Sequence, residues 1–474
     1  MRQKVILLDI KSKYSRVAAN KDLAGGLGTA TLIGKSLRAR LLEYMKHRSV
    51  SLPVMSLGYL AAIFQEGGWD VKVLRPTEPL KHETIDADLI LVPISIVDYK
   101  HEVSLVEHLP TDRTYKVGFY GTFASTMPQL FLPKGDFVIN GEPEQFALDI
   151  AAGAPLPNKG DVVVSKHVED LDSLPFPNWD QFPVHQYSYK PALMRKPIIT
   201  MLASRGCPYS CYFYCPYPIL EGRKVRKRSP KNVVDEMLYM KERYNIQGVD
   251  FRDPIFGIDK KWGAEFVNEL LTRKVDMHWS CETRLDILTE EILEQYYQAG
   301  MRNLNIGVES SSDDILKSSK RKPIEIQHQE KIINFCHKKG IHVAAFYIIG
   351  LETDTPASVL RTIKYAKKLN TGVAGFSIST PYPGTGFYKQ VEDKIFTTDY
   401  EQYNNTTPVY QHDGLTPKQM LKLKQKAWQE YYFRPAWLWR YMMIRPLKYR
   451  TNCLWNKFTA RQKCPTTTLE TLES

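Results

Sequence analysis

The stretch that decides the fold reads PIITMLASRGCPYSCYFYCPYP and spans residues 197–218. Its first half, PIITMLASR, is a short apolar run with the length and composition of a buried β-strand. Its second half places three of the seven cysteines, Cys207, Cys211 and Cys215, in one loop crowded with prolines and aromatic residues. A strand that ends in clustered thiols predicts a metal or redox site at the edge of a sheet.

Two kinds of metal site fit three thiols in one loop. A structural zinc site normally closes with four ligands, so it would need a remote fourth ligand such as His185 or His278. A cubane iron–sulfur cluster held by three thiolates keeps one iron without a protein ligand, and that iron can bind a small molecule. The residues of the loop alone leave both possibilities open.

Downstream of the loop, strand-like and helix-like runs alternate about six times. The expected strands are residues 197–205, 248–254, 276–284, 302–310, 342–350 and 372–380. Such βα repeats predict a partial (β/α)6 barrel of the TIM type over residues 191–390, with functional groups gathered at the carboxyl ends of its strands. The residues at those ends are Cys207, Asp253, Arg284 and Glu309.

Upstream, residues 1–150 have the alternating βα pattern of a doubly wound, flavodoxin-like parallel sheet. The expected strands are residues 4–10, 70–75, 88–96, 116–123 and 136–141, with a helix over 56–68. Segments 25–28, 95–98, 121–126 and 141–144 are expected on the ligand-binding rim. Residues 151–190 are rich in proline and are predicted to form an extended linker.

Residues 391–474 are predicted to be a helical, basic extension of the barrel. Helix-start signals occur at Thr416 here and at Ser229 inside the barrel, each followed by proline. From Phe433 to Lys463 there are eight Arg or Lys residues and no acid, interleaved with tryptophan and tyrosine. This extension is expected either to pack on the barrel or to make a peripheral contact with an anionic membrane. No motif indicates nucleic-acid binding.

Composition sets the expected compartment. The chain has 474 residues and a formal net charge of +12, which favours an acidic partner or simply solubility. We find no signal peptide and no apolar run of about 20 residues that could span a membrane. The odd number of cysteines does not suggest a disulfide framework, so a reducing cytoplasm is expected.

Together these segments resemble radical S-adenosylmethionine (SAM) enzymes with an N-terminal cobalamin-binding domain, over roughly residues 50–450. The matching stretches are GEPEQF (141–146), LDSLPFPNWDQFP (171–183), FRDPIF (251–256), CETR (281–284), NIGVESSSDDILK (305–317), FYIIGLETDT (346–355) and TPYPGTGFY (380–388). One departure is the cysteine spacing: the family usually has C-x3-C-x2-C, whereas this chain has C-x3-C-x3-C.

The resemblance implies a site. The three cysteines would hold a 4Fe-4S cluster whose open iron binds SAM, and an electron from the cluster would cleave SAM to a 5′-deoxyadenosyl radical. The residues expected to bind the cofactor are Asp253, Glu282, Gly307, Glu309 and Ser310, with Arg284 as a further catalytic group aimed into the barrel. Cobalamin is expected between the sheet rim and the barrel mouth. None of the histidines lies in the family's Asp-x-His-x-x-Gly motif, so no protein ligand to cobalt is predicted.

The implied activity is cobalamin-dependent methylation of an unactivated carbon in a small molecule or a lipid. The electron would come from an external donor such as flavodoxin or ferredoxin. Radical oxidative cyclisation or rearrangement without methyl transfer is the nearest alternative. A non-catalytic zinc-binding module is the alternative of another class.

Overall fold

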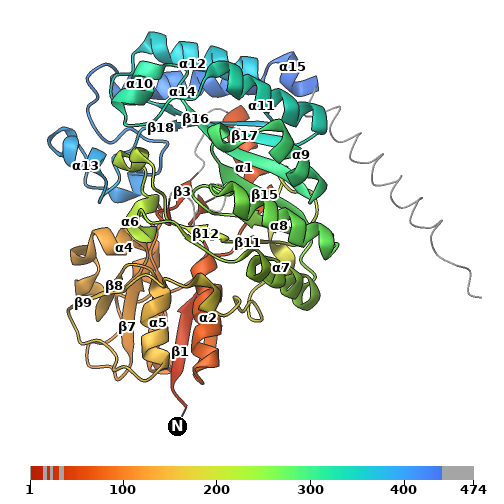
Figure 1. Ribbon diagram of the computed structural model, residues 1–474. Helices are drawn as coiled ribbons and strands as arrows, with labels where there is room; N and C mark the ends of the chain where they lie inside the picture. Colours follow the sequence, from red (N-terminus) through yellow and green to blue (C-terminus); the bar gives the residue numbers. More distant parts are fainter. Residues whose placement is uncertain (1, 14–18, 22–24, 31–36, 440–474) are drawn as a thin grey trace, which may run out of the picture.

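The computed structural model describes residues 2–13, 19–21, 25–30 and 37–439. Two parallel sheets, each with its own helices, lie one above the other (Figure 1). The N-terminal sheet occupies the lower half of this view, and the barrel occupies the upper half. The loop with the three cysteines runs between them.

The N-terminal sheet has six parallel strands in the order β5-β1-β6-β7-β8-β9. Their bounds are β1 Lys4–Leu8, β5 Asp70–Leu74, β6 Leu89–Pro93, β7 Lys116–Tyr120, β8 Phe137–Asn140 and β9 Asp161–Val164. The first strand along the chain lies inside the sheet, and the order reverses beside it, between β1 and β6. This confirms the doubly wound, flavodoxin-like topology and places the ligand-binding crevice at that reversal.

Helices cover both faces of this sheet because alternate side chains of each strand point to opposite faces. Leu7 and Leu91 point to the face covered by α2 (Met55–Glu66) and α5 (Pro143–Ala151). Their neighbours in the strands, such as Ile6, pack on the other face with side chains of α3 (Tyr99–Ser104) and α4 (Thr122–Thr126). The sheet is therefore buried on both faces, as apolar runs such as LILVP predict.

The stretch 151–190 is expected as a linker, but it also supplies two strands: β9 joins the N-terminal sheet as its sixth strand, and β10 (Ser188–Tyr189) pairs with β4 (Val50–Ser51). β9 pairs with β8 in parallel, with Val162 opposite Val138. The rest is an extended arm whose Trp179 is fully buried against α2, and the backbone N–H of Asn178 donates to the carbonyl of Gly58 at 2.9 Å. The arm is thus part of the core that joins the two halves.

The barrel sheet also has six parallel strands, in the chain order β11-β14-β15-β16-β17-β18. Their bounds are β11 Ile198–Met201, β14 Gly248–Phe251, β15 His278–Thr283, β16 Met301–Glu309, β17 His342–Ile349 and β18 Val373–Ile378. The outer layer consists of α7 Pro230–Tyr244, α8 Lys260–Thr272, α9 Glu290–Gln298, α10 Asp313–Ser318, α11 Ile326–Lys339 and α12 Pro356–Leu369. The prediction of a partial (β/α)6 barrel is confirmed, including the cap of α7 by Ser229.

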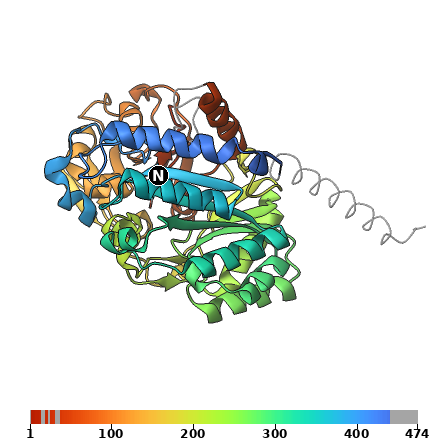
Figure 2. The ribbon, with the colours of Figure 1, turned by 90° about the horizontal axis from the view of Figure 1, so that it is seen from above.

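Smaller elements complete the barrel's two ends. A two-stranded ribbon of β12 (Ser204–Arg205) and β13 (Arg226–Lys227) precedes and follows the cysteine loop. Across the outer side, α14 (Pro417–Tyr432) packs against α12 and β18 and starts at Thr416 with a capping box, as predicted. The helix α1 (Leu37–Ser49) lies beside the carboxyl-terminal half of α14 (Figure 2).

The C-terminal extension is helical only in part. Within residues 391–416 the structure shows two short 3-10 turns and a bridge between Ile395 and Tyr410, but no α-helix. Helix occurs in α14 and in α15 (Pro435–Trp437). The rest of the predicted basic extension, residues 440–474, lies outside the described residues. In the described ranges, no helix is both long and apolar enough to cross a membrane.

Candidate active site

The cysteine loop starts at a turn that only glycine fits. Gly206 has φ of +90°, and a Cβ at this position would lie 2.1 Å from the carbonyl oxygen of Lys224. The Gly206 N–H donates to a carboxylate oxygen of Glu221 at 2.9 Å, and the Cys207 N–H donates to the carbonyl of Gly222 at 3.2 Å. The loop is therefore closed at its base by backbone contacts between its two ends, which fixes where Cys207 leaves the barrel.

The extra residue in the cysteine spacing is absorbed by one helical turn. Cys211 lies in the 3-10 helix η6 (Ser210–Phe213), and the Cys215 N–H donates to the Cys211 carbonyl at 2.9 Å. An i, i+4 contact of this kind puts the two side chains on the same side of the turn. The last two cysteines of C-x3-C-x3-C are an i, i+4 pair, whereas those of the usual C-x2-C are an i, i+3 pair. Both spacings place the two thiols on one side of a helical turn.

All three thiols lie in a water-poor environment and influence one another. Burial, with a smaller contribution from the neighbouring Cys211 sulfur, raises the pKa of Cys207 to about 11 and the pKa of Cys215 well above its ordinary value. Such thiols ionise only when a cation stabilises the thiolates. Within the described part of the chain, no three His, Cys, Asp or Glu side chains are arranged to hold a single metal ion.

Arg284, expected as a catalytic group, lies against the cysteine loop. Its guanidinium is 4.3 Å from the ring centroid of Tyr209, the residue between the first two cysteines. Two hydrogen bonds of 2.9 Å to the carboxylate of Asp286 hold it there. Its charge lowers the pKa values of Cys207 and Cys211, which burial raises. Arg284 therefore stabilises negative charge at the loop.

The end of β16 forms a second charged wall of the loop. Glu309 has φ of +63°, which is strained for a residue with a side chain, and the register of β16 shifts between Gly307 and Glu309. The bulge turns the Glu309 carboxylate over Gly307, to within 3.5 Å of the Arg321 guanidinium. Arg321 also donates to the Gly307 carbonyl at 2.6 Å and interacts electrostatically with Cys211. Arg321 was not among the site residues predicted from the sequence.

A third group of charges lies inside the barrel next to the loop. Glu282 accepts a hydrogen bond from Arg252 at 2.7 Å and another from the Tyr217 hydroxyl at 3.1 Å. Nε and Nη2 of Arg252 have no hydrogen-bond partner among the residues that the structure describes, although the side chain is only 3% exposed. A buried guanidinium edge with unused donors is costly unless a ligand accepts from it. Neither Arg252 nor Tyr217 was predicted as a site residue.

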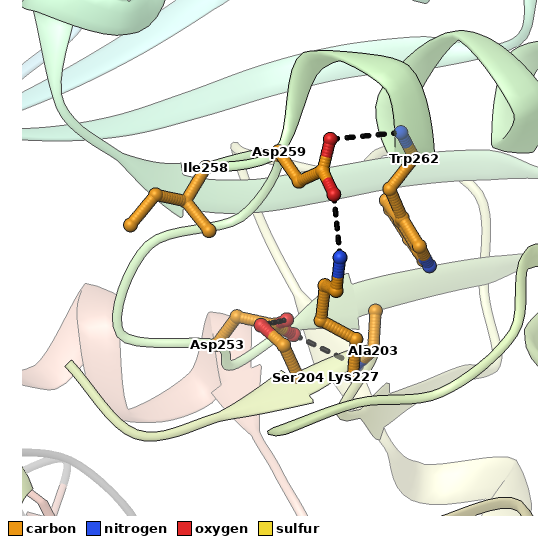
Figure 3. A pocket seen from close by; sticks show the side chains of 8 residues that line it. Ala203, Ser204, Lys227, Asp253, Ile258, Asp259 and Trp262 are labelled. Atoms are coloured by element: carbon orange, nitrogen blue, oxygen red, sulfur yellow. Dashed lines mark hydrogen bonds and ion pairs between the residues drawn. The ribbon is translucent and has the colours of Figure 1, made fainter. Parts of the chain in front are cut away.

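Two of the sequence-predicted residues are used elsewhere. Asp253 accepts hydrogen bonds from the Ala203 N–H at 2.9 Å and from the Ser204 hydroxyl at 2.6 Å, and so links the ends of β14 and β11. Figure 3 shows its carboxylate turned toward Ser204, in a small hollow beside the ion pair of Lys227 and Asp259. Ser310 Oγ accepts from the Ser312 N–H at 3.2 Å. No hydrogen bond or ion pair among the described residues joins either side chain to Cys207, Cys211 or Cys215, so their part in binding a cofactor stays a prediction.

A cavity of about 860 Å³, counting its opening to solvent, lies between the sheet rim and the barrel. All four rim segments predicted from the sequence contribute to its wall, and Arg205, Tyr217 and Arg252 face it from the barrel side. Gly25 allows the close approach of the two halves, since a Cβ there would lie 2.8 Å from the backbone of Tyr217. Tyr217, two residues after Cys215, therefore connects the wall of the cavity with the cysteine loop along the chain.

Four buried charges hold the two walls of the cavity together. Glu142 pairs with Arg226 and with Arg205, the latter at 3.0 Å, and Glu144 pairs with Arg205 at 2.7 Å. Burial raises the pKa of Glu142, but the two arginines lower it more strongly, so the net shift is downward. The stretch GEPEQF therefore binds the N-terminal half to the ribbon β12–β13, next to the cysteines.

The family of the barrel follows from this geometry and from the sequence. Residues 201–383, which contain the cysteine loop and all of the later barrel strands, match the sequence model of the radical SAM superfamily. The barrel is a radical SAM domain. The resemblance inferred from the cysteine loop is therefore confirmed for this part of the chain.

Relatives with assigned names extend the comparison. The chain is 29% identical over 270 residues to an uncharacterized methyltransferase of Pyrococcus horikoshii. The matched region covers 56% of this chain and 58% of the relative. It is 27% identical over 423 residues to the anaerobic magnesium-protoporphyrin IX monomethyl ester cyclase of Rubrivivax gelatinosus. This match covers 81% of this chain and 75% of the relative. The chain thus matches little more than half the length of the first of these proteins.

Solved structures show that the whole fold is shared. The radical SAM methyltransferase TsrM from Kitasatospora setae, with tryptophan and a SAM analogue bound, superposes with a TM-score of 0.63 over 92% of this chain and 90% of its own. The two sequences are 16% identical, so the likeness is one of fold. TsrM therefore has the same arrangement of an N-terminal sheet, a connecting arm and a barrel.

Proposed function

We propose that this chain is a radical SAM enzyme that uses cobalamin to methylate an unactivated carbon. The observation that carries the proposal is the loop at the barrel mouth, where three buried thiols influence one another electrostatically and the arginines Arg284 and Arg321 act on Cys211. When bound there by Cys207, Cys211 and Cys215, a 4Fe-4S cluster supplies the electron that cleaves SAM. The family match favours this cluster over the zinc module.

The residues around the loop suit the amino-acid end of SAM. Arg321 is buried beside Cys211 and presents a guanidinium, which is the side chain best matched to a carboxylate. Glu309 lies next to it and could accept hydrogen bonds from the SAM amino group or ribose. Arg284 and Glu282 complete the charged rim, whereas Asp253 and Ser310 act by fixing the strand ends.

The cavity between the two halves is the place proposed for cobalamin. It lies at the rim where doubly wound sheets bind ligands, and Tyr217, two residues after Cys215, lines it. When bound, cobalamin supplies a carrier for a methyl group. Its described lining contains no histidine, in keeping with the absence of the Asp-x-His-x-x-Gly motif. The unused N–H groups of Arg252 point to an acceptor on a ligand in this space.

Methyl transfer is the preferred reaction because the relatives named above include a methyltransferase and the fold is that of TsrM. The named cyclase keeps oxidative cyclisation as the second candidate. The substrate is proposed to be a small molecule or a lipid, and the electron donor a flavodoxin or ferredoxin. Cysteines that hold a cluster must stay out of disulfides, so we place the protein in the reducing cytoplasm.

An anaerobic reconstitution tests the proposal. Protein loaded with iron, sulfide and cobalamin is expected to hold about four iron and four sulfide per chain and to form 5′-deoxyadenosine from SAM under reduction. Methyl-deuterated SAM, incubated with an extract of the native organism, should yield a labelled product together with S-adenosylhomocysteine. Formation of 5′-deoxyadenosine without any methyl-labelled product would favour cyclisation, and a colourless protein with one zinc would refute both.

Arg321→Gln should weaken SAM binding because it removes the charged donor beside the loop. Loss of a charge-assisted hydrogen bond corresponds to roughly a 10- to 100-fold rise in the Kd for SAM. Titration of the reconstituted protein with SAM measures this, with iron content checked in parallel. Arg273→Gln, at the C-terminal cap of the outer helix α8, is the matched control and should bind SAM as the wild type does. Equal affinity in R321Q with an intact cluster would contradict the assignment.

A further inference from the structure

One helix of the N-terminal half shows an apolar face to solvent. In α1, the side chains of Leu37, Leu41 and Tyr44 are 84%, 58% and 47% exposed. Arg40 and Arg48 are exposed on the same side, and Arg48 donates to the Tyr44 hydroxyl at 3.1 Å. The spacing 37, 40, 41, 44, 48 follows one face of an α-helix. Three large apolar groups therefore lie in one stripe flanked by two guanidinium groups.

The opposite face of α1 attaches it to the barrel. Ala39 and Glu43 are buried, and Glu43 interacts electrostatically with the buried Lys424 of α14. Glu43 is the only acid of the helix, which also carries Arg38, Arg40, Lys46 and Arg48 in its sequence. Glu43 therefore lies on the inner face of α1, and the outer face has no negative charge.

The C-terminal elements add to the same side of the molecule. Phe433 is 41% exposed and Trp439 is 64% exposed, at either end of α15. Figures 1 and 2 both place α15 on the side where α1 lies. In the sequence, residues 440–463 follow with seven Arg or Lys residues and no acid. Apolar and aromatic side chains among cations are the composition of a helix that lies in a lipid interface.

We propose that the outer face of α1, together with α15, docks on the surface of an anionic membrane. Leu37, Leu41 and Tyr44 would enter the headgroup region, and Arg40 and Arg48 would pair with lipid phosphates. The face carries Arg40 and Arg48, and the sequence of residues 440–463 is also rich in Arg and Lys without acids. An anionic bilayer complements both.

Vesicle binding tests the proposal with the full chain. Vesicles of phosphatidylglycerol and phosphatidylcholine should retain the wild-type protein on sedimentation, and vesicles of phosphatidylcholine alone should not. Leu37→Glu with Leu41→Glu should reduce the bound fraction at least about tenfold, because it places acids on the docking face. Val162→Glu with Val164→Glu is the matched control: these side chains are 39% and 74% exposed on β9. The control should bind as the wild type does.

Other outcomes overturn the proposal. Absence of wild-type binding to anionic vesicles would do so, and so would equal binding by the α1 double variant. If the wild type instead forms a dimer in analytical ultracentrifugation that the α1 variant loses, the face is an interface between two copies. If it binds single-stranded DNA and loses that binding in the same variant, the anionic partner is a nucleic acid. Thermal unfolding and 5′-deoxyadenosine formation verify that the variants are folded.

Discussion

Replacement of Cys211 by alanine is expected to abolish cluster assembly and to reduce 5′-deoxyadenosine formation by at least about a thousandfold. Cys211 is the middle thiol of the loop, and Cys207 and Cys215 both respond electrostatically to it. In the wild type, three cysteines would hold three irons and SAM would bind the fourth. With only two thiols left in the buried loop, a second iron would have no protein ligand. The remaining thiols would stay protonated, because burial raises their pKa values.

The measurement is iron and sulfide per chain after anaerobic reconstitution, together with the visible absorbance and the product assay. Cys336→Ala is the matched control, because Cys336 is fully buried in α11, away from the loop. It should keep its iron and its activity while losing some thermal stability. If C211A kept about four iron per chain and cleaved SAM, the three-thiol assignment would be wrong. If wild type and C211A differed in zinc instead of iron, the zinc module would be correct.

The two sheets were predictable from the sequence because strands buried on both faces appear as continuous apolar runs, such as KVILL in β1 and LILVP in β6. β9 was not predicted, because its apolar run is only three valines long, its side chains are alternately exposed, and no α-helix follows it in the linker. It lies in a proline-rich stretch whose composition indicates a linker. Composition shows where the chain is extended but not whether an extended segment joins a sheet.

The cysteines could be found from spacing alone, but their partners could not. Arg321 lies in the run Lys320-Arg321-Lys322, and only the middle residue is buried. Nothing local separates it from its exposed neighbours, because its burial depends on the bulge at Glu309 and on Cys211. For Asp253, the pattern correctly gives the end of a strand, yet the Ala203 N–H and the Ser204 hydroxyl of the adjacent segment occupy both carboxylate oxygens. Side-chain direction at a strand end is a tertiary property.

Arg226→Ala is expected to lower the free energy of unfolding by about 3–5 kcal/mol, because it breaks a buried ion pair from one side. Arg226 donates to both oxygens of Glu142, to the Val168 carbonyl at 2.8 Å and to the Glu221 carbonyl at 3.1 Å. Its removal would take a donor from four acceptor oxygens in a water-poor interface, with Arg205 as the remaining arginine paired with Glu142. The two halves of the cavity wall would then separate more easily.

Denaturant unfolding measures the stability of R226A, and limited proteolysis of the arm over residues 151–190 reports separation of the halves. Lys224→Ala is the matched control, because Lys224 lies two residues earlier and pairs with Glu169 at the surface, with both side chains largely exposed. Exposed pairs of this kind contribute little, so the control should unfold at the wild-type denaturant concentration. Equal stability of R226A and K224A would show that the four charges position the walls of the cavity without holding them together. If instead R226A alone is cleaved faster in the arm and binds less cobalamin, then the pair of Arg226 with Glu142 supports cobalamin binding by keeping the cavity closed.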